Sequence, residues 1–145
     1  MKLSKRKELI KHNAKDLFNI VLDIESYPHF IPWCTDMKIH SKTNREIFAD
    51  MIVWYKFFIP QRFASHVLYD KEKLNINTTY IKGPLKDLRT TWLFTSIEKH
   101  QTIINFTVEF EFKRFLHQKF AEAFFPLIEK KMIESFKKRA DSLLN

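Results

Sequence analysis

The spacing of apolar residues changes along this chain, and the change limits the folds open to it. Between Met37 and Phe112, apolar side chains recur at every second position, as in strands with one buried face. From Leu116 to Ala140 they recur at every third or fourth position, as on the buried side of a helix. A run of strands followed by one long helix predicts an antiparallel sheet that curves around the last helix.

The alternation also predicts which side of each strand faces inward, since successive strand side chains point to opposite faces. The expected inward residues, strand by strand, are Ala49, Met51, Val53, Tyr55 and Phe57; Phe63, Ser65 and Val67; Ile76, Thr78 and Tyr80; Leu88, Thr90, Trp92 and Phe94; and Ile104, Phe106, Val108, Phe110 and Phe112.

Shorter elements precede the sheet. Residues 2–11 alternate weakly and carry several lysines, which is typical of an edge strand. Asn13 predicts the N-cap of a helix over residues 14–25. Pro28 and Pro32 then predict an ordered loop over residues 27–34, and Pro126 is expected to bend the last helix.

Composition limits the class of protein. With 145 residues and 15 phenylalanines, the chain is expected to form a single domain over residues 1–145 around a bulky core. Cys34 is the sole cysteine, so we expect no intramolecular disulfide and a reducing compartment. No apolar run approaches the roughly 20 residues of a membrane span, so any membrane contact should be peripheral. The net charge of +8 favours an anionic partner, RNA or a phospholipid surface, although an AT-rich genome also enriches lysine.

The motifs of common enzymes are missing from the sequence. Cys34 and His29 share a loop, but no third group to orient a nucleophilic pair is evident, so a small buried thiol is the simpler interpretation. The six histidines show no metal-ligand spacing, and the single glycine, Gly83, excludes a phosphate-binding loop. Glu109 and Glu111 share the outward face of a strand beside basic residues, which indicates solvated ion pairs. We therefore expect a protein that is not an enzyme and holds neither a metal nor a cofactor.

The interior instead has the character of a small-molecule pocket. A sheet curved around a helix leaves space that side chains need not fill, and the inward faces combine many aromatic rings with a few hydroxyl groups. Apolar walls with a few polar groups are typical of pockets of about 300 to 1,000 Å³ that bind small molecules. The chain is thus predicted to enclose an apolar ligand beneath its C-terminal helix.

Three separated segments carry a resemblance to a known family. They are residues 23–34 (DIESYPHFIPWC), residues 83–88 (GPLKDL) followed by Trp92 and Phe94, and residues 136–140 (FKKRA). In this order the segments resemble the coenzyme Q-binding START-like family, which belongs with polyketide cyclase/dehydrase-like proteins and is related to a bacterial ribosome-association toxin. Leu85 departs from the family pattern, which often has Phe there. The resemblance implies an α+β helix-grip (START-like, Bet v 1-like) fold with a tunnel between a curved antiparallel sheet and the C-terminal helix.

The resemblance also implies a function. It implies non-catalytic binding of ubiquinone or a related polyprenyl lipid, by a carrier that supports respiratory electron transport. The alternatives are a toxin that binds the large ribosomal subunit and blocks subunit association, and a polyketide aromatase/cyclase, which would need an inward acid or base that the sequence does not supply. The expected location is the bacterial cytoplasm, with peripheral contact at the inner membrane or with respiratory complexes, and DNA is not expected as a partner.

The inward residues and the motif positions together give one set of candidate ligand-binding residues. They are Tyr27, Phe30, Pro32, Trp33, Tyr55, Phe63, Ser65, Thr78, Tyr80, Leu88, Trp92, Phe94, Phe106, Phe110, Phe120 and Phe124.

Overall fold

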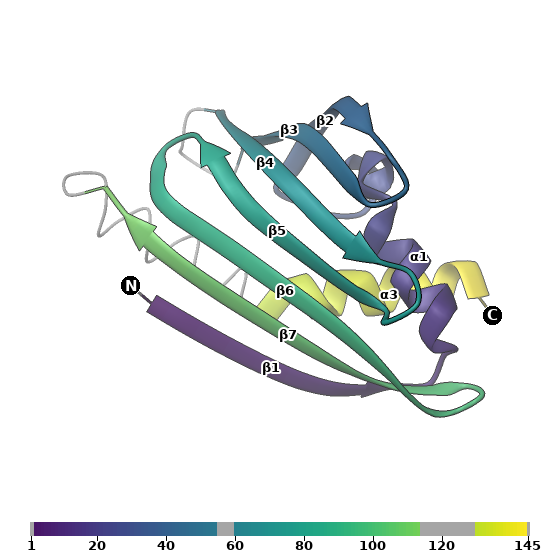
Figure 1. Ribbon diagram of the computed structural model, residues 1–145. Helices are drawn as coiled ribbons and strands as arrows, with labels where there is room; N and C mark the ends of the chain where they lie inside the picture. Colours follow the sequence, from purple (N-terminus) through teal and green to yellow (C-terminus); the bar gives the residue numbers. More distant parts are fainter. Residues whose placement is uncertain (1, 55–59, 114–129, 145) are drawn as a thin grey trace.

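The computed structural model describes residues 2–54, 60–113 and 130–144 (Figure 1). In chain order its elements are β1 (Lys2–Ile10), α1 (Ala14–Leu22), the 3-10 helix η1 (Ile24–His29), β2 (Cys34–Lys42), β3 (Glu46–Val53), β4 (Gln61–Asp70), β5 (Asn75–Lys82), β6 (Leu85–Glu98), β7 (Gln101–Phe112) and α3 (Met132–Leu144). No helix within these ranges is long and apolar enough to cross a membrane.

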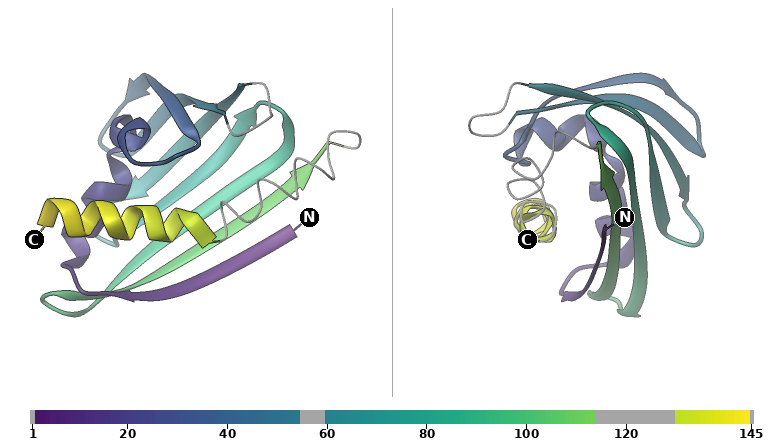
Figure 2. Two further views of the ribbon diagram at one scale, coloured as in Figure 1. Left: turned by 180° about the vertical axis from the view of Figure 1, so that it is seen from behind. Right: turned by 90° about the vertical axis from the view of Figure 1, so that its left-hand side faces the viewer.

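The strands form one antiparallel sheet in the order β1-β7-β6-β5-β4-β3-β2. Strands β2 to β7 follow one another as a meander, and β1 joins at the β7 edge, which confirms the predicted edge strand. Register shifts interrupt the β2–β3, β4–β5 and β6–β7 pairs. Such irregularities increase the local twist of a sheet. The sheet accordingly arches around α3, which Figure 2 shows end-on, and the predicted helix-grip fold is confirmed.

The predicted inward faces of the strands are confirmed over the described residues. In β7, Ile104, Phe106, Val108 and Phe110 are each at most 3% exposed, and every intervening residue is more exposed. Burial on one side of each strand places a largely apolar surface on the concave face of the sheet. Tyr55 and Phe57, predicted to continue the inward face of β3, lie outside the described residues.

The first helix begins where it was predicted and ends earlier. The Asn13 side chain accepts hydrogen bonds from the backbone N–H groups of Lys15 (3.0 Å) and Asp16 (3.2 Å), which confirms the N-cap. Helix α1 stops at Leu22 rather than at residue 25, and η1 follows. Asp23 accepts a hydrogen bond from the Ser26 hydroxyl at 2.6 Å, a local interaction that competes with the continuing helix. The predicted loop over residues 27–34 is therefore helical in its first part.

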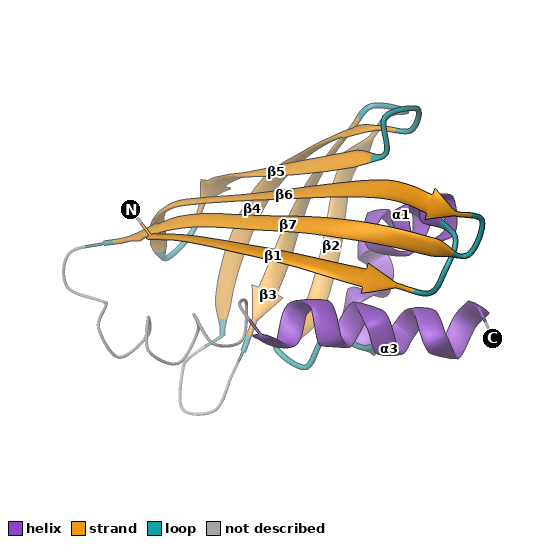
Figure 3. Ribbon diagram, turned by 90° about the horizontal axis from the view of Figure 1, so that it is seen from below, coloured by secondary structure: helices purple, strands orange, loops and turns teal. Residues whose placement is uncertain are grey.

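Helix α3 lies against the concave face of the sheet and contacts α1 (Figure 3). Ala140 is fully buried, which allows the helix to approach closely. The Asp141 carboxylate lies 2.7 Å from Nε2 of the buried His12, and the His12 carbonyl accepts a hydrogen bond from the Thr102 hydroxyl at 2.7 Å. These contacts hold the last turns of α3 beside the end of β1. The predicted helix before residue 130, with the bend at Pro126, lies outside the described residues.

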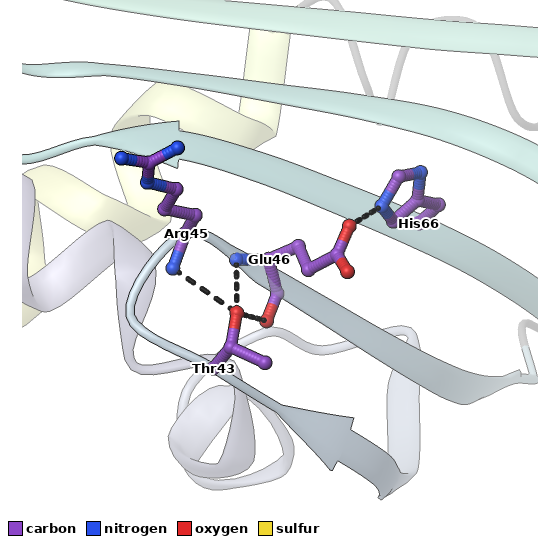
Figure 4. Close-up of polar contacts among 4 residues, drawn as sticks. All are labelled: Thr43, Arg45, Glu46 and His66. Carbon is purple, nitrogen blue, oxygen red and sulfur yellow. Dashed lines mark hydrogen bonds and ion pairs between the residues drawn. The ribbon is translucent and has the colours of Figure 1, made fainter.

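Polar contacts connect the turn between β2 and β3 to β4 (Figure 4). The Thr43 hydroxyl accepts hydrogen bonds from the backbone N–H groups of Arg45 (3.2 Å) and Glu46 (3.1 Å). The Glu46 carboxylate in turn lies 2.8 Å from Nε2 of His66 on β4. Because a one-residue slip would reverse every side chain of a strand, this network helps to decide which β4 residues face inward.

Candidate ligand-binding cavity

A cavity of about 120 Å³ lies between the concave face of the sheet, the segment that contains η1, and α3. Its wall is almost entirely apolar. It is lined by Ile24, Tyr27, Ile31 and Trp33 from the η1 segment, by Met37, Ala49, Met51, Phe63, Ser65, Val67, Ile76, Thr78, Leu88, Thr90, Trp92 and Phe106 from the sheet, and by Met132 and Phe136 from α3.

This volume is smaller than the 300 to 1,000 Å³ predicted from the general size of ligand pockets. Apolar protein cavities of about 150 Å³ accept benzene. In the conformation described, the space between these side chains therefore suits a ring-sized group rather than a polyprenyl chain.

Phe136 joins the three walls of the cavity. Its ring packs edge-to-face on Tyr27 and Phe30 of the η1 segment, with centroid distances of 5.2 Å to each, and on Trp92 of β6 at 5.1 Å. The Arg139 guanidinium lies over the ring of Phe30, 5.1 Å from its centroid. Aromatic pairs of this geometry are favourable beyond the area that they bury, so Phe136 holds α3 at a fixed height above the sheet.

The oxygen-bearing side chains of the wall are hydroxyls. Ser65, Thr78 and Thr90 lie on β4, β5 and β6, the three central strands of the sheet. The Tyr27 hydroxyl donates a hydrogen bond to the carbonyl of Val21, so it already has a partner within the protein. Burial, and to a smaller extent the charges of Cys34 and Asp23, raises the Tyr27 pKa well above its usual range, so this phenol stays neutral.

Half of the sixteen predicted site residues line this cavity. They are Tyr27, Trp33, Phe63, Ser65, Thr78, Leu88, Trp92 and Phe106. Their ligand-binding role stays a prediction. Tyr55, Phe120 and Phe124 lie outside the described residues.

Tyr80 faces inward but is not among the residues that line the cavity. Its hydroxyl donates a hydrogen bond to the Leu85 carbonyl (2.8 Å) and accepts one from the Leu85 N–H (3.0 Å). The same side chain packs against the turn at Gly83, where a Cβ atom would stand 2.7 Å from the Arg62 carbonyl oxygen and 3.0 Å from the Tyr80 ring. Gly83 has a positive φ of 155°, so glycine is required here both by space and by backbone conformation. Tyr80 thus closes the β5–β6 turn.

The other four predicted residues also lie elsewhere. Phe94 packs edge-to-face on Phe18 of α1 at 5.9 Å, and Phe110 contacts Phe112 at 4.9 Å, both deep in the core. Pro32 is exposed, and Phe30 lines a different hollow beside α1. The family motifs and the alternation along the strands predicted that these residues face the interior. They did not show which part of the interior each residue faces or how far it lies from α3.

Sequence reasoning missed the methionines of the wall. Met37, Met51 and Met132 come from β2, β3 and α3 and line the cavity together with the aromatic rings. Met51 and Met132 lie on faces that the sequence predicts to be buried, but aromatic residues alone were chosen there. Methionine side chains are flexible and polarizable, so this part of the wall can adapt to the shape of a ligand.

The catalytic alternatives gain no geometric support. Burial raises the pKa of the Cys34 thiol to about 12, so it is protonated at neutral pH, and His29 is exposed while Cys34 is buried. Glu111 lies 3.8 Å from Lys86 on the outer face of the sheet, away from the cavity. Among the described residues, no cluster of His, Cys, Asp or Glu side chains could hold a metal ion.

A larger hollow of about 220 Å³ lies at the surface between α1, η1 and the end of α3. Asp16, Asp23 and Arg139 line it together with exposed apolar side chains such as Leu143. Charged groups that face open solvent do not favour an apolar ligand, because such a ligand would remove their hydration. The apolar cavity beneath α3 is therefore the stronger candidate for a ligand site.

A curved antiparallel sheet that encloses an apolar cavity beneath its C-terminal helix defines a START-like protein of the helix-grip class. The sequence profile of one such family, described as polyketide cyclase/dehydrase and lipid transport, matches residues 10–137. The chain belongs to this family.

Relatives and solved structures agree with this assignment. The chain is 30% identical to the ribosome association toxin RatA of Rickettsia prowazekii, over 94% of both chains. It is 27% identical to the mitochondrial coenzyme Q-binding protein COQ10 of Drosophila melanogaster, over 90% of this chain and 55% of that protein. The crystal structure of the aromatase/cyclase Zhui from Streptomyces sp. R1128 superposes with a TM-score of 0.87 over 99% of this chain and 96% of its own, at 12% identity. At that identity the likeness concerns the fold alone.

Proposed function

We propose that this chain binds ubiquinone or a related polyprenyl lipid in the cavity beneath α3 and acts as a non-catalytic carrier that supports respiratory electron transport. The observation that carries this proposal is the wall of the cavity, in which aromatic rings, methionines and aliphatic side chains surround a few hydroxyls. The family description, which includes lipid transport, and the similarity to a coenzyme Q-binding protein support the same ligand class.

A non-catalytic role agrees with the chemistry of the wall. Among the described lining residues, Tyr27 is the sole titratable side chain, and its raised pKa keeps it neutral. A general acid or base works best with a pKa near the operating pH, so Tyr27 is poorly suited to that task. The described wall therefore supports binding and offers no acid–base pair to a cyclase.

The proposed location is the bacterial cytoplasm, with transient contact at the inner membrane. Each isoprene unit left in water costs about 4 kcal/mol, at about 0.8 kcal/mol per buried carbon. A polyprenyl quinone therefore has to pass directly between the membrane and the protein, and the proposed carrier must cover more of the chain than the ring-sized cavity admits. The flexible methionine wall is the part best able to make that room.

The tryptophans provide a direct test of ligand binding. Trp33 and Trp92 line the cavity, whereas Trp54 is 53% exposed, and quinones quench tryptophan emission at short range. Titration with decylubiquinone without detergent should give saturable quenching that persists in Trp54→Phe and shrinks in Trp92→Phe. Quenching that never saturates, or that disappears with Trp54, would show that the quinone does not enter the cavity.

A second candidate function is association with the large ribosomal subunit, as a toxin that blocks subunit joining. Its support is the 30% identity to a ribosome association toxin over nearly the whole of both chains, together with the net charge of +8. Contacts to RNA phosphates weaken steeply as salt rises. Cosedimentation with 50S particles at low salt, lost at high salt, is the expected result, and absence from ribosomal fractions at low salt would contradict it.

A further inference from the structure

The three hydroxyls in the cavity wall lie together on the floor of the cavity. Thr78 on β5 stands directly opposite Thr90 on β6, and Ser65 on β4 is diagonal to Thr78 because Ser65 pairs with Tyr80. Directly opposed residues have Cβ atoms about 5 Å apart, and diagonal neighbours are separated by about 7 Å. We call Ser65, Thr78 and Thr90 the hydroxyl strip.

The hydroxyl strip is bordered by apolar residues. Across the sheet, it ends at Ala49 on β3, which pairs with Ser65, and at Val108 on β7, which pairs with Thr90. Along β5, the inward neighbours of Thr78 are the buried Ile76 and the half-buried Tyr80, whose hydroxyl is bonded to Leu85. The strip is therefore a confined polar patch at the centre of an apolar surface.

None of the three hydroxyls has a hydrogen-bond partner among the residues that the structure describes. All three residues are half-buried, and polar groups that are withdrawn from solvent normally have a hydrogen-bond partner. Valine has nearly the same shape as threonine and would need no such partner at residues 78 and 90. Free hydroxyls that line a cavity are the expected feature of a site whose partner is a ligand.

We propose that the hydroxyl strip hydrogen-bonds the oxygen substituents of a planar ring, so that the oxygenated ring of the ligand, and not its apolar chain, occupies the cavity above β4, β5 and β6. This inference rests on the proposed function and specifies how the ligand lies. The volume of about 120 Å³ is of the same order as that of cavities that accept benzene, and the aromatic side chains of Trp33, Trp92 and Phe136 provide faces and edges against which a ring packs.

Oxygenated rings and hydrocarbon rings should therefore bind in this cavity with different affinities. A ring that carries carbonyl or alkoxy oxygens gains hydrogen bonds from the strip, whereas a hydrocarbon ring of the same size covers the hydroxyls and leaves them unpaired. Each hydrogen bond contributes about 1 kcal/mol, so losing one weakens binding about 5-fold and losing two weakens it about 30-fold.

The test compares two probes that carry the same decyl tail on different rings, decylubiquinone and decylbenzene. Their affinities are measured by displacement of a fluorescent apolar dye. Thr78→Val and Thr90→Val should each weaken decylubiquinone binding about 5-fold, and the double variant about 30-fold. Decylbenzene should bind these variants as well as, or better than, the wild type. Thr79→Val and Thr91→Val are matched controls, since these threonines lie on the same strands and point outward, and they should leave both affinities unchanged.

The outcomes distinguish the inference from the proposed function. Thr78→Ser keeps a hydroxyl and should bind decylubiquinone nearly as the wild type does, which separates hydrogen bonding from a change in packing. If the wild type binds decylubiquinone and the double variant, folded by circular dichroism, binds it equally well, the hydroxyl strip is not the ring site and the proposed function stands. If the wild type binds neither probe, the proposed function fails and the inference fails with it.

Discussion

Filling the cavity should abolish ligand binding and leave the fold intact. Ala49 on β3 is 4% exposed, lines the cavity and pairs with Ser65 of the hydroxyl strip. The substitution Ala49→Leu adds carbon atoms to a space of about 120 Å³ that otherwise accepts a ring.

The expected effects on stability and on binding differ in size. Burying the added carbons contributes about 2.4 kcal/mol at about 0.8 kcal/mol each, and crowding costs about 1 to 3 kcal/mol, so the free energy of unfolding should change by less than about 1.5 kcal/mol. A ligand ring excluded from the cavity loses the burial of about six carbons, or about 5 kcal/mol, so binding should weaken at least 100-fold.

Two measurements check this prediction, urea unfolding for stability and the decylubiquinone titration for binding. The matched control is Ala64→Leu on the neighbouring strand, which faces the opposite side of the sheet and should keep the wild-type affinity. An Ala49→Leu protein that is folded and binds decylubiquinone as tightly as the wild type would refute the assignment of the ligand to this cavity.

Three further predictions concern stability and reactivity. Gly83→Ala should lower the free energy of unfolding by about 1 to 3 kcal/mol in urea titrations, because its Cβ atom would meet the Arg62 carbonyl, and an unchanged midpoint would contradict this. Cys34 should react with an aromatic disulfide reagent at pH 8 far more slowly in the native state than in urea, since burial raises its pKa to about 12, and equal rates would contradict its burial. Hydrogen bonds with His40 and, to a smaller extent, Arg62 lower the pKa of the Asp50 carboxyl in the folded protein. The ionised carboxylate should therefore stabilise the fold fully above the unfolded-state pKa of about 4, and this stabilisation should be lost as pH falls through the lower, folded-state pKa. Asp50→Asn should thus lower stability at pH 7 and reduce its further loss in acid, and a fall in acid as steep as that of the wild type would contradict this.

Local sequence patterns were sufficient to predict the strands, because burial of one face places an apolar residue at every second position. The inward faces of β4 to β7 follow from that alternation, as does the N-cap at Asn13. The end of α1 was harder to predict. A hydrogen bond from Ser26 to Asp23 forms where the helix stops, but nothing in the sequence distinguishes these two polar residues from others that lie within helices. Periodicity thus specifies the face of an element more reliably than its last turn.

The candidate site could be predicted in character but not in extent. Tyr80 and Thr78 lie on the same face of β5, but they have different surroundings. The Tyr80 hydroxyl is hydrogen-bonded to the Leu85 carbonyl, whereas Thr78 lines the cavity. That difference depends on the geometry of the β5–β6 turn and on where α3 crosses the sheet, and both are set by residues distant in sequence. Phe94 similarly packs beneath α1 instead of facing the cavity.

The central claim is that the cavity beneath α3 holds an apolar ligand with an oxygenated ring. Mass spectrometry of organic extracts from protein purified without detergent tests it most directly, with Ala49→Leu purified in parallel. We predict a polyprenyl quinone in the wild-type extract and its loss from the extract of the variant. A wild-type extract without quinone, from protein that also fails to take up added quinone, would contradict the claim.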